Sequence, residues 1–319
     1  MPEEKQDTRS GYFLGFDGGG TKTDCVLVDA EGKILARSTA GPSNPLRAGY
    51  AKAWFTLSDA ADVVLEHEKI KAKDISGICA GIGGAGREAV ANRLATFLER
   101  AFPEAAVQVT TDLAITLQAA VGSGEGIILV VGTGSAAYGR DAGGKIARAG
   151  GRGPWFSDEG SGFDIGRRAM AAVVRAEEGR GEKTALSEQI LKWLGCNDWN
   201  RVLDWVIKNP DDVFPRVFPL VASLGDKGDA VACGILSGAA ESLATLARSV
   251  LVRLDMLDRE VPIAKCGGAL GRSTFFDTEI DRGLTRVVPR ARIVSLQEKP
   301  AVSAARLAIR LGWRKAHAG

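Results

Sequence analysis

Two glycine-rich loops that carry hydroxyl side chains stand out in this sequence, each directly after an apolar run. The first follows Asp17 and consists of Gly18, Gly19, Gly20, Thr21, Lys22 and Thr23. The second consists of Gly132, Thr133, Gly134 and Ser135. Glycine brings backbone N–H groups close to an anion because no side chain obstructs the approach. The hydroxyls and the Lys22 ammonium add donors, so both loops are predicted to bind phosphate.

Both loops begin a longer repeat in the chain. The first is followed by an apolar run and the turn Asp-Ala-Glu-Gly-Lys at 29–33, and the second by Asp-Ala-Gly-Gly-Lys at 141–145. The spacing from Gly20 to Asp29 equals that from Gly132 to Asp141. A single glycine loop can be a tight strand connection. Two loops that each open onto a β-hairpin predict two related domains around one ligand.

Two carboxylates lie where strands are expected to end. Asp17 closes the predicted strand at 12–16, and a carboxylate there could hold a hydrated Mg²⁺. Asp112 follows the predicted strand at 107–111, and could accept the proton of an attacking hydroxyl. An Asp at this position can also be the N-cap of a following helix. Both roles of Asp112 remain open at this point.

A second dense group of polar and aromatic residues occurs at 155–162. Trp155 offers a ring that could stack on a sugar, and Asp158 and Glu159 offer hydrogen-bond acceptors for its hydroxyls. The alternative is helix capping by Asp158 or Ser161. Asn44, in the turn Ser-Asn-Pro at 43–45, is a further candidate sugar contact.

Two other glycine clusters require interpretation. The run at 81–86 satisfies GxGxxG, but no acid stands at the end of the next strand about 20 residues on, as a dinucleotide site needs. We therefore expect it to be a wall of the ligand cleft. Gly267 and Gly268 lack neighbouring hydroxyls and cations, which suits contact with a flat ring such as adenine or a simple helix-entry turn.

Composition excludes several classes of function. The chain has 319 residues with a net charge of +2, and no basic run interleaved with aromatics, so no nucleic-acid partner is expected. The longest apolar run, at 127–131, is too short to cross a membrane. Residues 1–7 are polar, unlike a signal peptide, and the five cysteines are scattered without CxxC spacing, so a cytoplasmic location is predicted.

The order of elements predicts an α/β protein. Strands are expected at 12–16, 24–28, 33–37, 75–80, 107–111, 127–131, 263–266 and 292–296. Helices are expected at 88–101, 186–194, 199–207 and 301–311, with the longest stripe of apolar residues between 236 and 257. The predicted domains are residues 1–112, with the terminal helix in 297–319 packing back on them, and residues 113–296, which include a helical insertion.

These motifs in this order resemble the N-acetylglucosamine kinase and glucosamine kinase branch of the sugar kinase–Hsp70–actin superfamily, grouped with the BadF/BadG/BcrA/BcrD ATPases. The resemblance rests on DGGGTKT at 17–23, Ser-Asn at 43–44, Thr-Thr-Asp at 110–112, GTGS at 132–135, DEGSG at 158–162 and Gly-Gly at 267–268. It implies a duplicated RNase H-like fold, as in actin-like ATPases, with ATP and Mg²⁺ in the cleft between two domains.

The same resemblance implies roles for individual residues. Asp112 would be the catalytic base for phosphorylating a sugar hydroxyl, O6 in the amino-sugar kinases. The implied sugar contacts are Asn44, Thr133, Trp155 and Asp158. The two glycine loops would hold the phosphates, and a homodimer is expected by analogy.

Two alternatives remain open from the sequence. One is an ATPase activator of a reductase of the BadF type, in which cysteines hold an Fe–S cluster at a dimer interface. Cys196 and Cys233 are its candidates here, without paired spacing. The other is a nucleotide-dependent binding protein, like Hsp70 or actin, whose ATP turnover is indifferent to sugar.

Overall fold

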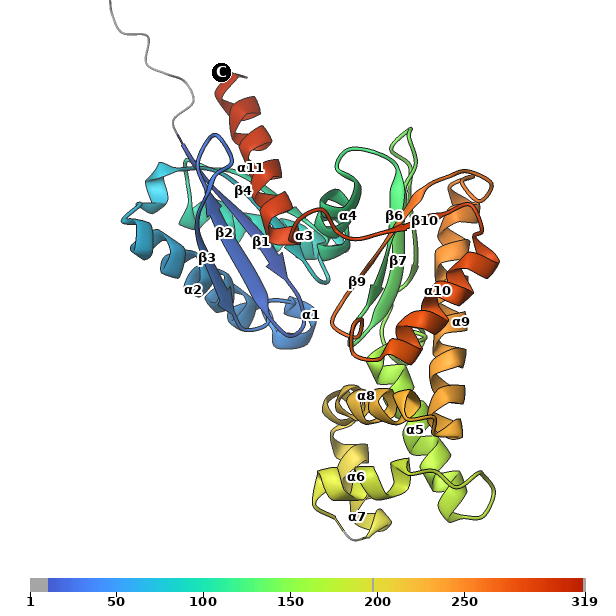
Figure 1. Ribbon diagram of the computed structural model, residues 1–319. Coiled ribbons are helices and arrows are strands. Elements are labelled where there is room, and N and C mark those ends of the chain that lie inside the picture. The colour runs from blue at the N-terminus through green and yellow to red at the C-terminus, as the bar shows by residue number, and fades with distance from the viewer. Residues whose placement is uncertain (1–10, 197, 318–319) are drawn as a thin grey trace, which may run out of the picture. The chain divides into compact units, whose positions relative to one another are not determined.

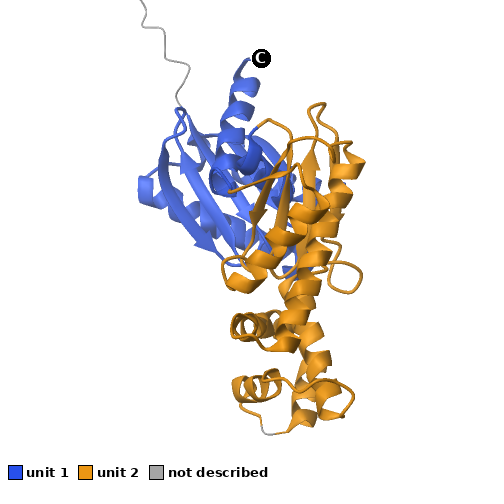
Figure 2. Cartoon of the chain, turned by 45° about the vertical axis from the view of Figure 1, so that its right-hand side comes forward, with its two compact units in different colours: residues 1–122, 296–319 blue, residues 123–295 orange. Residues whose placement is uncertain are grey.

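The computed structural model describes residues 11–196 and 198–317. The segment 1–7, from which the absence of a signal peptide is predicted, lies outside them. The chain divides into two compact units, one of residues up to 122 together with those from 296 onward, and one of residues 123–295 (Figure 1 and Figure 2). We call them unit 1 and unit 2 and describe each by itself.

Each unit is built on a mixed sheet of the same topology. Unit 1 has the strands β1 (Tyr12–Gly18), β2 (Thr23–Val28), β3 (Ile34–Ala40), β4 (Ile75–Ile82) and β5 (Ala106–Thr110). Unit 2 has the strands β6 (Gly126–Val131), β7 (Ser135–Arg140), β8 (Ile146–Gly150), β9 (Pro262–Cys266) and β10 (Arg292–Val294).

The strand orders are β3-β2-β1-β4-β5 and β8-β7-β6-β9-β10. In both sheets the first three strands form antiparallel hairpins, and the last two run parallel to the first. The predicted duplication and the α/β class are confirmed.

The repeated sequence Asp-Ala-x-Gly-Lys forms the same turn in both sheets. The Asp29 Oδ1 accepts a hydrogen bond of 2.8 Å from the Lys33 amide, and the Asp141 Oδ1 accepts one of 2.9 Å from the Lys145 amide. Gly32 and Gly144 have φ angles of 81° and 85°, a left-handed region that glycine enters without strain. The turn between β2 and β3, and between β7 and β8, is thus a structural part of the repeat.

Side chains of β1 alternate between two helical layers in unit 1. Leu14 and Phe16 lie in a core with α2 (Tyr50–Glu68) and α3 (Glu88–Ala101). Phe13 points to the opposite face, where it lies in a core with α4 (Asp112–Val121) and α11 (Pro300–His317). The strand period of two places successive residues on opposite faces, so one sheet buries apolar surface on both sides. Two short elements complete the unit, α1 (Pro45–Ala48) and η1 (Ala72–Asp74).

Helix α11 approaches the sheet of unit 1 so closely that glycine is required beneath it. A Cβ on Gly15 would lie 2.2 Å from the Ala305 nitrogen, and one on Gly77 would lie 2.4 Å from the Ala308 oxygen. Both atoms belong to the backbone of α11 and cannot rotate away. The alanine-rich face of this helix and the two glycines therefore fit each other.

We expect Gly15→Ala to lower the free energy of unfolding by about 1–3 kcal/mol, the usual cost of overpacking. A matched control is Gly234→Ala in α9 (Ala230–Arg253), where a Cβ would meet nothing within 4 Å. That change should stabilise by about 0.5–1 kcal/mol, because glycine is unfavourable inside a helix. Urea unfolding of both variants checks the prediction, which is wrong if both shift the midpoint in the same direction.

Unit 2 contains most of the helices. They are α5 (Gly162–Glu177), α6 (Leu186–Leu194), α7 (Trp199–Lys208), α8 (Pro210–Asp226), α9 and α10 (Thr274–Val287). Within this unit, α6 and α7 lie away from the sheet, beyond α8 (Figure 1 and Figure 2). One apolar core joins all of these helices to the sheet.

Helix α9 is, among the described residues, the one helix long and apolar enough to cross a membrane. Its buried side chains, which include Leu236, Leu243 and Val250, belong to the core of unit 2. The apolar stripe predicted from the sequence therefore packs inside the protein.

Helix α8 was not predicted from the sequence. Pro215 and Pro219 lie inside this helix, and proline removes a hydrogen-bond donor and normally ends helices. The helix continues because Phe214, Val217 and Phe218 are buried in the core of unit 2. Tertiary packing here outweighs local preference.

Helix α4 belongs to unit 1, although the boundary predicted from the sequence lies at Asp112, where this helix begins. Ile115 of α4 shares a core with α11, and the Ala119 oxygen accepts a hydrogen bond of 3.0 Å from the Gln297 amide. Unit 1 therefore continues to Gly122 and resumes at Leu296.

Candidate functional site

Three loops of unit 1 meet where β1 ends. The Gly19 oxygen accepts hydrogen bonds of 3.1 Å from the amides of Ser43 and Asn44, and the Gly18 oxygen accepts one of 2.7 Å from the Gly83 amide. A Cβ on Gly18 would lie 2.1 Å from the Ser43 Oγ. The glycine loop is therefore held in shape by its neighbours before any ligand is present.

The side chains of this first loop divide into two groups. Gly20, Thr21 and Lys22 are exposed, and the Lys22 Nζ lies 2.6 Å from an Asp24 carboxylate oxygen. Thr23 is buried, and its hydroxyl lies within hydrogen-bond distance of the Ser43 hydroxyl. The exposed residues are open to solvent, while the Thr23 side chain holds the loop to its neighbour.

Asp17 and Asp112 lie close enough in unit 1 to affect each other. Asp17 is in β1 and Asp112 follows β5, and both strands run parallel to β4, which lies between them. Burial, together with the charges of Asp112 and Asp24, raises the pKa of Asp17 to about 7, against a smaller opposing effect of Lys22. The Asp17 carboxylate is thus poorly compensated by protein groups.

Thr111, rather than Asp112, is the N-cap of α4. The Thr111 hydroxyl accepts a hydrogen bond of 3.1 Å from the Ala114 amide, while Asp112 is the first residue of α4. The Asp112 Oδ1 accepts a hydrogen bond of 2.9 Å from the adjacent Leu113 amide. Asp112 therefore stands at the positive end of the helix dipole.

The carboxylates at this end of the sheet fit a hydrated divalent cation. A Mg²⁺ ion would offset the repulsion between Asp17 and Asp112, which the protein groups leave in place. Among the described residues no three His, Cys, Asp or Glu side chains converge as a metal cluster. This agrees with the preference of Mg²⁺ for one or two carboxylates, water and substrate phosphates.

The raised pKa of Asp17 predicts how unfolding depends on pH without metal. A carboxyl whose pKa is higher in the folded state stabilises the fold when protonated, and that contribution is lost as pH rises through about 7. Asp17→Asn mimics the protonated form, so it should stabilise the protein at pH 8, by at most about 4 kcal/mol, and change little near pH 4. Urea unfolding in a chelator checks this, and parallel pH profiles for both proteins would contradict it.

Gly83 brings Asn44 and Asp112 together in unit 1. A Cβ on Gly83 would lie 3.1 Å from the Asn44 Nδ2 and 3.4 Å from the Asp112 Oδ2. The Asn44 Oδ1 accepts a hydrogen bond of 3.0 Å from the Leu46 amide, which leaves its Nδ2 directed at this region. The glycine run at 81–86 thus provides the space in which the amide and the carboxylate meet.

In unit 2 the second glycine loop is fixed to the start of α5. The oxygens of Gly132 and Thr133 accept hydrogen bonds of 2.8 Å and 3.3 Å from the amides of Gly162 and Phe163. The Ser135 hydroxyl, 2% exposed, donates a bond of 2.7 Å to the Glu159 oxygen. Thr133 is exposed and Ser135 is not, so Ser135 links the loop to the acidic segment.

The acidic segment holds Asp158 in an unusual backbone conformation. Asp158 is buried and has a φ of 65°, a left-handed value that costs energy for a residue with a Cβ. A Cβ on Gly134 would lie 2.9 Å from the Asp158 Oδ2. Asp158 therefore lies against the second glycine loop.

Trp155 and Phe156 project from the same segment. Their exposed fractions are 65% and 89%, and the Trp155 ring meets the Phe163 ring edge-on at 5.9 Å between centroids. Large exposed aromatic groups are costly in water and are often found at binding sites. Phe156 is a candidate ligand contact that was not predicted from the sequence.

The glycines after β9 have different tasks. Gly267 has a φ of 116°, and a Cβ there would lie 2.3 Å from the Val131 oxygen, so close packing against β6 requires it. Gly268 is exposed, and a Cβ there would meet nothing within 4 Å. A Cβ on Gly132 would lie 3.9 Å from the Gly268 nitrogen. The open surface at Gly268 thus adjoins the second glycine loop.

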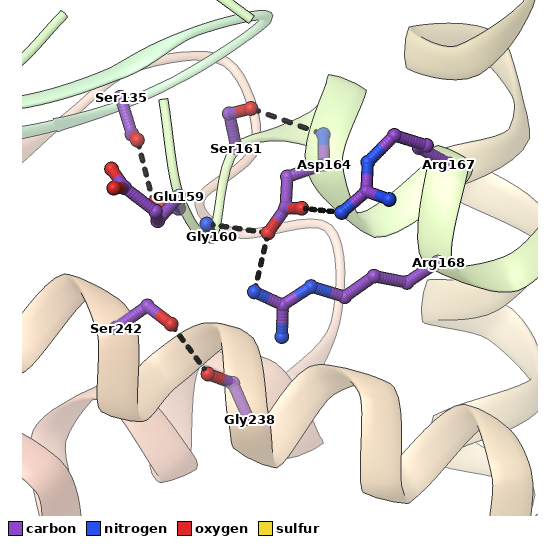
Figure 3. A network of polar contacts seen from close by, with 9 residues as sticks. All are labelled: Ser135, Glu159, Gly160, Ser161, Asp164, Arg167, Arg168, Gly238 and Ser242. Atoms are coloured by element: carbon purple, nitrogen blue, oxygen red, sulfur yellow. Dashed lines mark hydrogen bonds and ion pairs between the residues drawn. The ribbon is translucent and has the colours of Figure 1, made fainter. Parts of the chain in front are cut away.

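A network around Asp164 was not predicted from the sequence. Asp164 is buried in the first turn of α5 and bonds to the acidic segment and to two arginines of its own helix (Figure 3). The signal was present as Ser161, an N-cap type of residue, followed three positions later by the acid Asp164, a spacing typical of a capping box.

The chain was compared with known proteins. Residues 14–308 match the model of the BadF/BadG/BcrA/BcrD ATPase family. An N-acetylmuramic acid/N-acetylglucosamine kinase from Clostridium acetobutylicum is 30% identical over 92% of this chain and 96% of its own length. An N-acetyl-D-glucosamine kinase from Dictyostelium discoideum is 29% identical over 93% of this chain and 97% of its own.

Solved structures are also similar to this chain. The crystal structure of a candidate N-acetylglucosamine kinase from Chromobacterium violaceum is 28% identical, with a TM-score of 0.77 over 95% of this chain and 99% of that one. A ROK family glucokinase from Streptomyces griseus, at 18% identity and a TM-score of 0.61 over 94% of this chain and all of that one, shares the fold. The family match over residues 14–308, the duplicated sheets and the glycine loops together show that this chain belongs to the BadF/BadG/BcrA/BcrD ATPase family.

Proposed function

We propose that this protein is an ATP-dependent kinase that phosphorylates an amino sugar, N-acetylglucosamine or glucosamine, at O6. The observation that carries the proposal is the similarity over most of the chain to proteins named as kinases of N-acetylglucosamine, N-acetylmuramic acid and glucosamine. The geometry at Asp17 and Asp112 supports it, because phosphoryl transfer needs a cation site and a base close together.

Asp112 is the general base in this proposal. Its place at the start of α4, beside Gly83 and Asn44, puts the carboxylate next to an amide that can hold a sugar hydroxyl. The Asp112 carboxylate accepts the proton as the sugar oxygen attacks the γ-phosphorus of ATP. The bond from that phosphorus to the β–γ bridging oxygen breaks, and ADP leaves.

Asp17 holds the cation, through water, in this proposal. Bound Mg²⁺ supplies positive charge that neutralises the phosphate oxygens during transfer. The Asp17 carboxylate would hold the hydrated ion, and the exposed residues Gly20 and Thr21 are the candidates to bind the phosphates. Lys22 is exposed and can exchange its Asp24 partner for a phosphate oxygen.

Residues of unit 2 are also candidates for ligand binding in this proposal. The exposed Thr133 in its glycine loop donates to a phosphate or a sugar hydroxyl, and Gly134 of the same loop lies beside Asp158. Asp158 accepts from sugar hydroxyls and Trp155 stacks on the sugar ring. Gly268 leaves room for the adenine, while Ser135 and Gly267 support the loops from beneath.

Identification of the product tests the proposal. The protein, with ATP and Mg²⁺, is incubated with N-acetylglucosamine and with glucosamine, and the products are analysed by ³¹P NMR with proton coupling. A phosphomonoester signal coupled to two methylene protons is expected, since O6 is carried by a CH₂ group. A doublet from a ring CH would reject O6, and the absence of any sugar phosphate would reject the kinase.

A further inference from the structure

Asp164 contacts two parts of unit 2 that belong to different elements. Its Oδ2 accepts a hydrogen bond of 3.0 Å from the Gly160 amide in the acidic segment. Its backbone amide donates a bond of 3.2 Å to the Ser161 hydroxyl, the N-cap of α5. The side chain thus reaches back over the end of its own helix to the residue before the cap (Figure 3).

Two arginines surround the carboxylate from the other side. The Arg167 guanidinium lies 3.0 Å from Oδ1, and the Arg168 guanidinium lies 2.8 Å from Oδ2. A Cβ on Gly238 of α9 would lie 3.3 Å from an Arg168 nitrogen, so this arginine also touches the neighbouring helix. Asp164 is buried, and charged bonds of this kind are stronger than neutral ones. Asp164 is therefore held by two charged partners on its own helix in addition to its bond to the loop.

The segment that Asp164 holds is the strained one. Asp158 has a φ of 65° two residues before Gly160, which itself has a φ of 77°. A Cβ on Gly160 would lie 2.5 Å from the Ala239 oxygen, so the segment is pressed against α9. Strained backbone persists only where surrounding contacts determine it. The Asp164 bond to the Gly160 amide is one such contact, two residues after the strained Asp158.

We propose that Asp164 is a positioning residue: through the Gly160 amide it holds the 158–161 segment in the conformation that presents Asp158 to the acceptor sugar. This inference rests on the proposed function for the identity of the acceptor. Asp164 does not touch the substrate. Its effect passes through two backbone units, and a misplacement of about 1 Å in a site can cost on the order of 10²-fold in rate.

The hydrogen bonds of the second glycine loop do not depend on Asp164, so loss of Asp164 should affect the sugar more than ATP. The oxygens of Gly132 and Thr133 bond to the amides of Gly162 and Phe163, and neither bond involves the Asp164 side chain. Loss of that side chain should therefore disturb the acidic segment more than the phosphate loop. The expected signature is a change in the sugar parameters with the ATP parameters nearly unchanged.

The variants are Asp164→Ala, which removes all side-chain bonds, and Asp164→Asn, which keeps one acceptor oxygen. We expect kcat/KM for the sugar to fall about 10- to 100-fold in the alanine variant and less in the asparagine variant. The KM for ATP should stay within about threefold of wild type. All assays are run well below the unfolding temperature of each variant.

Two controls separate the loop contact from charge loss. Arg168→Gln removes one ion pair and leaves the Asp164 bond to Gly160 in place. Asp212→Asn breaks an exposed i,i+4 pair with Arg216 on α8, 2.8 Å long, in the same unit. Both should keep kcat/KM for the sugar within about threefold of wild type. A loss in Arg168→Gln equal to that in Asp164→Ala would overturn the role of the Gly160 contact.

Hydrogen exchange gives a readout that does not depend on activity. Amides in a peptide covering 157–165 should exchange faster in Asp164→Ala and Asp164→Asn than in Asp212→Asn, because the segment loses its anchor. Unchanged exchange, or an active alanine variant with wild-type sugar parameters, overturns the inference even if the kinase assignment holds. A wild-type protein without sugar kinase activity but with the exchange difference would reject the proposed function and keep the positioning of the segment.

Discussion

Asp112→Asn is expected to lower kcat for sugar phosphorylation by about 10²- to 10⁴-fold, the usual worth of general-base help. Asparagine keeps the size and can keep the hydrogen bond from the Leu113 amide, but it cannot accept the hydroxyl proton. The KM for ATP should change little, because the proposal assigns Asp112 to the acceptor sugar. The measurement is steady-state ADP release at saturating sugar and ATP.

A matched control for this experiment is Asp62→Asn, at an exposed acid on α2 in the same unit. It removes the same charge from unit 1 without touching the site, and its kcat should equal that of wild type. If Asp112→Asn keeps a rate within a few-fold of wild type while the control behaves as expected, Asp112 is not the base.

Asp17→Asn is expected to raise the Mg²⁺ concentration for half-maximal activity, or lower the rate, by about 10- to 100-fold. This is the range for groups that hold a metal through its surrounding ligands. The reason is the loss of the carboxylate that the cation neutralises, since an amide oxygen carries no charge. A Mg²⁺ titration at fixed ATP measures the effect, with Asp62→Asn again as the control.

Asp17→Asn is expected to raise stability and to lower activity, so two independent measurements test the same site. Without metal, Asp17→Asn should be more stable than wild type at pH 8, because burial and Asp112 raise the pKa of Asp17. With Mg²⁺ and substrates it should be less active. A variant that is both less stable and less active would indicate misfolding at the end of β1 rather than a lost cation site.

The repeat in the sequence predicted the fold well because it is carried by local chemistry. The strand period, the glycine turn at Gly32 and Gly144, and the Asp side chain that closes each turn are all local features. The parallel strands β9 and β10 could be placed by analogy with β4 and β5, since duplicated units repeat their order.

The elements that were not predicted depend on distant parts of the chain. Helix α8 contains Pro215 and Pro219, and only the burial of its phenylalanines explains why it continues. The length of unit 1 depends on the packing of α4 against α11, whose segments are far apart in sequence. No local window contains either contact.

The candidate site was also predictable only in part. Spacing located the glycines and acids at strand ends, but it did not show which of their neighbours each side chain contacts. Ser135 is buried beneath its loop, and the pair of Asn44 and Asp112 is joined by Gly83. Such details depend on loops that meet in space, so they required the structure.

We expect ATP turnover by this protein to be coupled to an amino sugar. A coupled assay of ADP release, run with ATP and Mg²⁺ over a panel of hexoses and hexosamines, measures this coupling. Turnover should saturate with N-acetylglucosamine or glucosamine, be weaker with hexoses that lack the amino group, and fall to background without sugar. Equal ADP release with and without every sugar would contradict it and would favour a nucleotide-dependent binding protein.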